Sequence, residues 1–353
     1  MNTSTTQRGN TTRLSKWQRI APVITLLLLA PIISEVLSGS TRISTMFVLI
    51  PEIGIWGGGA LLIRYLARRW QRDWVTIFLL GLVLALAEEC LIQQTSLAPL
   101  VGVDPAHVYA RAWGVNWLYL LWALGYESIW VVVVPIQLTE LIFPEQRTEA
   151  WIGRRGLIAT SIFFVLASFM AWYSWTQIFV PRYYPQGAYQ VPVLTFGIAL
   201  AAMIVLTVIA MLRKPAPQSG QKTTRPAPQP WLVGLVTFVL GLLWFLQILL
   251  AYGVIPTLPV PVSIGAGLIL AGAAFFLLRT WSSSLDWRDA QRLALVLGIL
   301  IATWLGGIII LNMNLVLTMS HASLIDSIGQ VLFNVITLLL LIPLARRIQR
   351  SQA

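Results

Sequence analysis

Charged residues are scarce in this chain of 353 residues. Asp, Glu, Lys and Arg together make up 10% of the sequence, whereas apolar residues make up 57%. Soluble domains carry about 25% charged residues. The composition therefore excludes an ordinary soluble globular protein and indicates an integral membrane protein, with the lipid bilayer as its surroundings.

Cysteine and histidine are almost missing as well. The single Cys90 excludes a disulfide within one chain and a CxxC redox site. The only two histidines, His107 and His321, are far apart in the sequence, and zinc-spaced Cys/His clusters, phosphate-binding Walker loops and G-x-S-x-G elbows are all absent. We therefore expect no metal site and no cofactor, and any activity must be built from helices and short loops.

Long apolar runs are what the sequence has in abundance. Ten of them approach the length of about 20 residues that crosses a bilayer as a helix. They fall at residues 20–38, 46–66, 74–95, 117–143, 156–178, 192–212, 231–252, 261–278, 293–315 and 325–345. The eighth run is short, and the long fourth run contains Pro135, which predicts a kink. The predicted fold is an all-α, polytopic transmembrane bundle of about ten helices.

Basic residues are concentrated in alternate connections between these runs. The two tails, the 2–3, 4–5, 6–7 and 8–9 connections and the adjoining helix ends hold 21 of the 24 Lys and Arg residues. The other connections hold only Arg42, Arg111 and Arg182. Because cytoplasmic loops retain basic residues, we expect both termini to be cytoplasmic. The net charge of +11 then reflects topology, and nucleic acid is not expected as a partner.

One low-complexity stretch divides the chain. The Pro-rich segment RKPAPQSGQKTTRPAPQP, residues 213–230, has the composition of a solvated cytoplasmic linker. It separates a six-helix membrane region, 20–212, from a four-helix membrane region, 231–345. A cytoplasmic tail, 1–19, precedes them, and a basic cytoplasmic tail, 346–353, follows them.

The positions of the 13 acidic residues are the most informative feature for function. Those in the cytoplasmic connections are expected to form solvated pairs with arginines, and Glu140, at the end of the fourth helix, is expected to reach solvent. The others lie in the outer half or near the middle of the membrane: Glu35, Glu52, Glu88, Glu89, Glu127 and Asp326. Intramembrane carboxyl groups avoid lipid and face a cavity or a partner, so this clustering in the first four helices predicts a polar site.

Helix geometry suggests how the deep acids are arranged. Neighbours on a helix diverge by about 100°, so Glu88 and Glu89 are not expected to point at one partner along the same line. Glu89 shares a face with Gln93, and Asn116 lies three turns from Glu127. The binding candidates are Glu35, Glu52, Glu88, Glu89, Gln93, Asn116 and Glu127. The alternative is that each acid is neutral or hydrogen-bonded locally and only fixes helix register, which is favoured for Glu35, Glu52 and Asp326 near helix ends.

Several segments resemble those of a known group of proteins. They are EVLSGST (35–41), GGGALLIRYLARR (57–69), AEECLIQQTSLAPL (87–100), GVNW (114–117) and VPIQLTELIFPEQRTEAWIGRRGL (134–157). In these segments the chain resembles a group of uncharacterised bacterial multi-pass membrane proteins that carry an E-L-L-S-G-S-T segment and an intramembrane Glu-Glu pair. The resemblance covers the first five helices, and members of that group often have His at the position of Glu127. It implies a family and a location in a bacterial plasma (inner) membrane, but no activity.

The pair Glu88-Glu89 is also similar to the E-E-x-x-x-R motif of prenyl-protease-like intramembrane enzymes, which works with histidines on later helices. In this chain Gln93 stands at the Arg position, and no predicted helix contains His. The similarity implies a glutamate-dependent hydrolase, but the groups that polarise the scissile carbonyl in that scheme are missing.

Three functions are compatible with the sequence. The first is a transporter or permease component with an outward-facing acidic site for a small solute or cation. The second is a non-catalytic partner or assembly protein whose acids pair with another membrane protein. The third is an intramembrane hydrolase in which Glu88 or Glu89 acts as general base.

Overall fold

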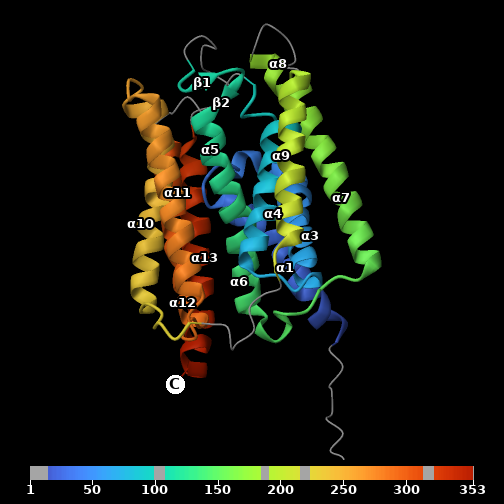
Figure 1. Cartoon of the computed structure of the whole chain (residues 1–353), viewed down its shortest axis with the longest axis vertical. Helices are drawn as coiled ribbons and strands as arrows, with labels where there is room; N and C mark the ends of the chain where they lie inside the picture. The colour runs from blue at the N-terminus through green and yellow to red at the C-terminus, as the bar shows by residue number, and fades with distance from the viewer. Residues whose placement is uncertain (1–14, 99–107, 184–190, 215–222, 313–321, 353) are drawn as a thin grey trace, which may run out of the picture.

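The computed structural model of the chain is a bundle of nearly parallel helices (Figure 1) and describes residues 15–98, 108–183, 191–214, 223–312 and 322–352. Within these ranges, ten helices are long and apolar enough to cross a membrane. They are Trp17–Val36, Ile43–Arg69, Trp74–Ile92, Trp117–Ile142, Arg154–Arg182, Val193–Leu212, Pro230–Val254, Val260–Ser282, Asp289–Ile309 and Leu324–Ser351. The prediction of an all-α multi-pass membrane protein with ten spans is confirmed.

The first five spans contain several changes of helix type. Their elements are α1 (Lys16–Pro31), η1 (Ile32–Val36), η2 (Ile43–Val48), α2 (Leu49–Glu52), η3 (Ile53–Gly57), α3 (Gly58–Arg69), α4 (Trp74–Ala87), η4 (Glu88–Ile92), α5 (Trp117–Tyr126), η6 (Glu127–Val133), α6 (Val134–Ile142), α7 (Arg154–Trp172), η8 (Tyr173–Phe179) and α8 (Val180–Tyr183). The 3₁₀ turn η7 (Pro144–Gln146) follows α6, and the short strands β1 (Arg111–Ala112) and β2 (Val115–Asn116) form an antiparallel hairpin before α5.

The later spans are more regular. They are α9 (Val193–Leu212), α10 (Pro230–Leu249) with η10 (Leu250–Val254), α11 (Val260–Ser282), α12 (Asp289–Asn312) and α13 (Leu324–Gln352). The eighth span is α11, which is longer than the short apolar run from which it was predicted. It has 23 residues, because the helix starts directly after Pro259 and continues through the polar residues Arg279 to Ser282, which an apolar run does not include.

Local signals in the sequence account for several boundaries. Ser15 and Gln18 form a capping box at the start of α1, and the Asp73 side chain accepts a hydrogen bond from the Thr76 N–H at the start of α4. Pro135 is the second residue of α6, where the π-helical η6 gives way to α-helix. Because proline has no N–H, it removes one backbone hydrogen bond at this change of helix type.

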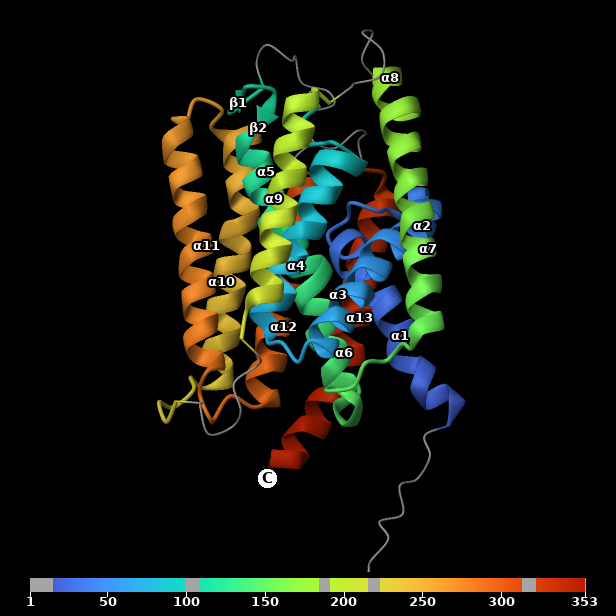
Figure 2. The ribbon, with the colours of Figure 1, turned by 45° about the vertical axis from the view of Figure 1, so that its right-hand side comes forward.

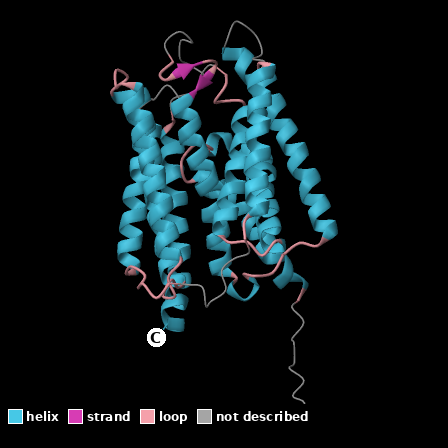
Figure 3. Ribbon diagram, in the orientation of Figure 1, coloured by secondary structure: helices cyan, strands magenta, loops and turns pink. Residues whose placement is uncertain are grey.

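The described chain begins and ends at the same end of the bundle. In Figure 1 the start of α1 and the end of α13 lie at the bottom, and the β1–β2 hairpin lies at the top. Figure 3 shows that the strands occur only at this upper end. We call the two ends the terminal face and the hairpin face. The helix order places the described members of the larger basic set, such as Arg68, Arg72, Arg154, Arg213 and Arg288, at the terminal face.

The helices differ in how much of their surface they bury. Span Trp74–Ile92 is the most enclosed, with 61% of its apolar window buried, whereas Arg154–Arg182 buries only 6%. Figure 2 shows α7 and α11 at opposite edges of the bundle. α4 packs against η6 and α9, and α10 pairs with α12, which also contacts α6. The α4–η4 and α5–η6 spans therefore form the interior, where a polar site is shielded from lipid.

Close helix approach depends on glycine at one clear position in the α10–α12 pair. A Cβ on Gly298 would lie 2.3 Å from the carbonyl oxygen of Gly234 and 2.3 Å from Oγ1 of Thr237. These distances are far below van der Waals contact, so the two backbones can touch only without a side chain at this position.

We predict that Gly298→Ala lowers the free energy of unfolding by about 1–3 kcal/mol, because the added methyl group pushes α12 away from α10. The matched control is Gly272→Ala in α11, where a Cβ meets nothing within 4 Å and the effect should stay within about 0.5 kcal/mol. Thermal or chemical unfolding in detergent micelles, followed by tryptophan fluorescence, measures the difference. Equal stability of the two variants would contradict the packing described here.

Candidate functional site

The deep glutamates lie in segments where the backbone departs from α-helix. Glu88 and Glu89 begin the π-helical η4, and Glu127 begins the π-helical η6. Glu35 lies in the π-helical η1, and Glu52 directly precedes the π-helical η3. In η4 the N–H of Gln93 donates to the carbonyl of Glu88 at 2.9 Å, a bond that spans five residues. Single π-helical turns inside α-helices occur frequently at functional sites.

Three of these side chains meet at one point. The carboxyl groups of Glu88, Glu89 and Glu127 each place an oxygen within 4.8 Å of the others. All three residues are buried, with exposed fractions of 2%, 3% and 6%. We call them the carboxylate cluster. Gly81, two turns before Glu88, brings the two elements together, because a Cβ there would lie 3.1 Å from the Cα of Ser128.

Both Glu88 and Glu89 reach Glu127, although neighbouring residues on an α-helix diverge by about 100°. The backbone at this point is π-helical. A π-helical turn holds more residues, so neighbouring side chains diverge less. The long glutamate side chains span the remaining angle.

The polar contacts of the cluster leave negative charge unbalanced. Ser96 Oγ donates a hydrogen bond of 2.6 Å to Oε2 of Glu89. Glu88 Oε1 and Glu127 Oε2 are buried without a hydrogen-bond partner among the described residues. The ion pairs that Arg64, Arg68, Arg147, Arg213 and Arg292 form involve none of these carboxyl groups. Because a buried ionised group requires compensation, the cluster must hold protons, a cation, or both.

Two further acids extend from the cluster. Glu35 is partly exposed and lies within electrostatic range of Glu88, Glu127 and Glu52. Oε1 of Glu52 accepts a hydrogen bond of 2.5 Å from the Thr41 hydroxyl, and Oε2 of Glu52 has no partner among the described residues. The structure therefore brings Glu35 close to the cluster and links Glu52 to it through Glu35.

Asp326 lies apart from these groups. Its carboxylate accepts hydrogen bonds from the backbone N–H of Ser44 at 3.1 Å and from the hydroxyl of Ser323 at 2.7 Å. These hydrogen bonds hold the start of α13 against the segment after Arg42. This is the alternative that the sequence favours for Asp326, in which a locally hydrogen-bonded acid only fixes helix register.

Asn116 has a different place from that expected, whereas the shared face of Gln93 and Glu89 stays a prediction. Asn116 lies in β2 and not in the helix of Glu127, so the two residues do not form one helical stripe. Gln93 is the partly buried residue that follows η4. The hydroxyl that binds Glu89 belongs to Ser96, which sequence reasoning missed. Its only signal is a polar pair, Thr95-Ser96, directly after the apolar run.

Asn116 holds the β1–β2 hairpin over the hairpin-face end of η4. Its Nδ2 donates to the carbonyls of Thr95 at 3.1 Å and Ala98 at 2.9 Å, and its Oδ1 accepts from Arg111 at 2.6 Å. Arg111 also donates to the carbonyl of Leu97 at 2.9 Å. The hairpin and residues 95–98 thus cap the cluster on this side.

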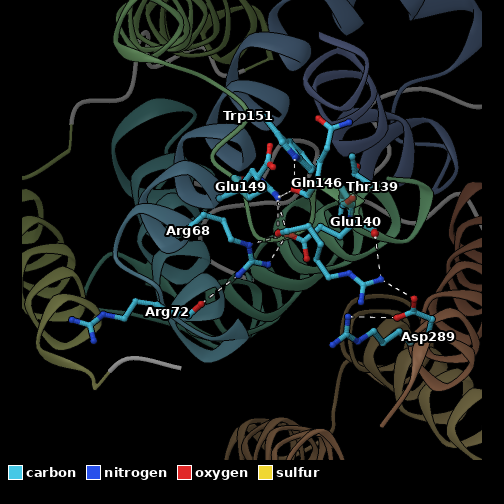
Figure 4. Close-up of polar contacts among 12 residues, drawn as sticks. Arg68, Arg72, Thr139, Glu140, Gln146, Glu149, Trp151 and Asp289 are labelled. Carbon is cyan, nitrogen blue, oxygen red and sulfur yellow. Dashed lines mark hydrogen bonds and ion pairs between the residues drawn. The ribbon is translucent and has the colours of Figure 1, made fainter. Parts of the chain in front are cut away.

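A second buried network lies near the terminal face. Arg64 and Glu140 have exposed side-chain fractions of 1% and 2%, and Arg64 Nε lies 2.9 Å from Glu140 Oε1. Arg68 Nη2 approaches the same oxygen to 2.5 Å (Figure 4). We call these three residues the arginine–glutamate network. The network joins α3 to α6. The membrane interior and the surrounding loop shield its charged groups from water.

The loop after α6 wraps the Arg64 guanidinium. Arg64 donates to the carbonyls of Arg147 and Glu149, each at 2.9 Å, and lies 3.2 Å from the ring centroid of Trp151. Arg147 in turn pairs with Asp289 of α12 at 2.8 Å (Figure 4). Arg64 therefore links α3 to α6 and to the loop after α6, and Arg147 links that loop to α12.

The prediction that Glu140 reaches solvent is wrong. Arg64 and Arg68 are four residues apart on α3 and both face Glu140, so the carboxylate is neutralised inside the protein. Solvated pairs are present for two of the acids in these connections: Asp289 pairs with Arg147, and Asp73 pairs with Arg213 at 2.9 Å, and all four side chains are partly exposed.

The carboxylate cluster lies between the β1–β2 hairpin and the arginine–glutamate network. Glu127 and Glu140 are in one span, and at 1.5 Å per residue their separation is roughly 20 Å. The hairpin cap lies on one side of the cluster and the arginine–glutamate network on the other. His107 and His321, the two dispersed histidines, lie outside the described residues.

We predict that Glu140→Gln lowers the free energy of unfolding by about 3–5 kcal/mol, because it leaves buried Arg64 without an anion. Asp289→Asn is the matched control, since it removes a partly exposed pair that contributes about 1 kcal/mol or less. Chemical unfolding in detergent compares the two variants. A loss no larger for Glu140→Gln than for Asp289→Asn would contradict the buried network.

Comparisons with protein-family models, with curated proteins and with solved structures find no match for this chain. What the fold and the geometry establish is a multi-pass membrane protein with a buried cluster of three glutamates, Glu88, Glu89 and Glu127.

Proposed function

We propose that the protein is an ion-coupled membrane transporter, or the permease component of one, and that the carboxylate cluster binds the coupling proton or cation. The observation that carries this proposal is the convergence of three buried carboxyl groups without a basic partner among the described residues. Ionisable groups at membrane depth commonly mark ion pathways and proton relays.

The charge of the cluster supplies a mechanism for coupling. With a bound ion, the carboxyl oxygens are compensated and tolerate a closed, water-free surrounding. Without the ion, three carboxylates within 4.8 Å repel one another and require water. Ion binding therefore favours the closed state over a hydrated, open state, which is the differential interaction that a conformational change needs.

The closures on the two sides of the cluster fit alternating access. A carrier opens its central site to one side at a time, by moving one part of the bundle against another. In this proposal the β1–β2 hairpin, held by Arg111 and Asn116, closes one side. The arginine–glutamate network closes the other side. The state described here is then the occluded one.

We further propose that the terminal face is cytoplasmic, in a bacterial plasma membrane. The excess of basic residues at that face supports this orientation. The carboxylate cluster then opens outward: Glu88 and Glu89 lie at the end of the α4–η4 span that approaches the hairpin face.

The resemblance to the bacterial multi-pass group is consistent with a shared site. Its segments contain Glu88, Glu89 and Ser96 of the cluster and Arg64 and Glu140 of the network. We propose that this group uses the same two polar centres.

The other two functions receive less support from the geometry. A binding partner's arginine would have to enter between carboxyl groups that are buried and face one another. A hydrolase of the prenyl-protease-like scheme would place histidines beside the paired acids, and among the described residues the cluster contains only the three glutamates.

We predict that Glu88→Gln and Glu127→Gln each reduce ion movement at least about tenfold, because an amide cannot exchange a proton or compensate a cation. Purified protein in liposomes is given imposed gradients of H⁺, Na⁺, K⁺ and Mg²⁺, and internal pH and current are recorded. Glu145→Gln, in the exposed loop after α6, is the charge-matched control and should retain the wild-type rate. Equal rates in all variants would count decisively against the proposal.

A further inference from the structure

We infer that the carboxylate cluster is a binding site for one hard divalent cation of the Mg²⁺, Mn²⁺ or Ca²⁺ class. The role of this cation as the coupled or transported ion rests on the function proposed above, whereas its binding can be tested independently. The inference uses the donor atoms, their spacing and the unpartnered oxygens of the cluster.

The donor atoms suit hard cations. Glu88, Glu89 and Glu127 supply only carboxylate oxygens, and neither a histidine nor a thiolate belongs to the group. Oxygen donors favour Mg²⁺, Ca²⁺ and Mn²⁺, whereas imidazole and thiolate favour zinc, copper and iron. Cys90 follows Glu89 in the sequence, but its sulfur is not part of the group.

The spacing matches a single ion. Ca²⁺ binds oxygen at about 2.4 Å, so two oxygens on opposite sides of it are about 4.8 Å apart. The corresponding span for Mg²⁺, at about 2.1 Å per bond, is about 4.2 Å. No pair among the three ligand oxygens exceeds 4.8 Å. One ion can therefore contact all three carboxyl groups with side-chain shifts of well under an ångström.

Unpartnered oxygens provide a second observation. Glu88 and Glu127 are 2% and 6% exposed, and Glu88 Oε1 and Glu127 Oε2 have no hydrogen-bond partner among the described residues. The desolvation of such oxygens is unfavourable unless a ligand contacts them. Glu89 is different, because the Ser96 hydroxyl holds one of its oxygens at 2.6 Å. This hydrogen bond orients Glu89, whereas Glu88 Oε1 and Glu127 Oε2 remain available to bind the cation.

The amount of charge favours a divalent ion over a single proton. Three carboxylates converge, and Glu35 places a fourth acid within electrostatic range of Glu88 and Glu127. One proton neutralises one of these groups. A divalent cation compensates two charges and coordinates several oxygens at once.

The test uses the full-length protein in detergent, stripped of metal with a chelator and titrated with Mn²⁺. The electron paramagnetic resonance signal of free Mn²⁺ reports binding. We expect one saturable Mn²⁺ site per chain that Mg²⁺ or Ca²⁺ displaces. Glu88→Gln and Glu127→Gln should weaken Mn²⁺ binding at least about tenfold, the minimum expected when a metal site is perturbed.

Two controls separate binding from folding. Glu145→Gln, outside the membrane interior, should bind Mn²⁺ as the wild type does. Glu89→Asp keeps the charge but shortens the side chain, and should weaken Mn²⁺ binding less than Glu88→Gln does. Mn²⁺ should also raise the melting temperature of the wild type and of Glu145→Gln, but not of Glu88→Gln.

The outcomes distinguish this inference from the proposed function. Absence of a saturable Mn²⁺ site, or unchanged Mn²⁺ affinity in Glu88→Gln, overturns the inference. If proton flux in liposomes still depends on Glu88 and Glu127, the proposed function stands without the metal. If Mn²⁺ binds at the cluster but no ion moves across the membrane, the inference stands and the proposed function fails.

Discussion

The interior of this protein depends on how it compensates carboxyl groups that the membrane separates from water. The helix bundle compensates its buried carboxyl groups in two different ways. Near the terminal face, Glu140 meets Arg64 and Arg68, so its charge is balanced within the chain. In the carboxylate cluster, Glu88, Glu89 and Glu127 meet one another. Since like charges in a low dielectric repel strongly, the second arrangement requires bound protons, a cation, or both, and the proposed function rests on this requirement.

The local backbone makes this arrangement feasible. η4 and η6 begin at Glu88 and Glu127, so the helix type changes where the acids converge. A π-helical turn leaves backbone groups less regularly paired and redirects side chains. The most buried span of the bundle carries two of the three acids, and Gly81 lets it contact η6 without an intervening side chain. The enclosing helices α7, α9 and α11 bury little and keep lipid away from the centre.

Much of the architecture could be predicted from the sequence, because it follows from one-dimensional patterns. Apolar runs of bilayer length located the ten spans, and the depth of Glu88 and Glu127 in those runs marked them as costly and therefore informative. The sequence indicated a polar site with Glu88, Glu89 and Glu127 among its residues, but it did not indicate the π-helical turns that carry these side chains, since nothing in the residue types specifies a π-helical turn. The burial of Glu140 depended on Arg64, which is 76 residues earlier in the chain, and the role of Ser96 depended on a loop folding back over η4.

A structure determined experimentally with Mn²⁺ present would test the central claim most directly, through the anomalous scattering of the metal. The account predicts one strong peak between the carboxyl oxygens of Glu88, Glu89 and Glu127, at about 2.2 Å from each of them. Three side chains that point in separate directions, each hydrogen-bonded to its own neighbours and with no metal peak between them, would contradict it.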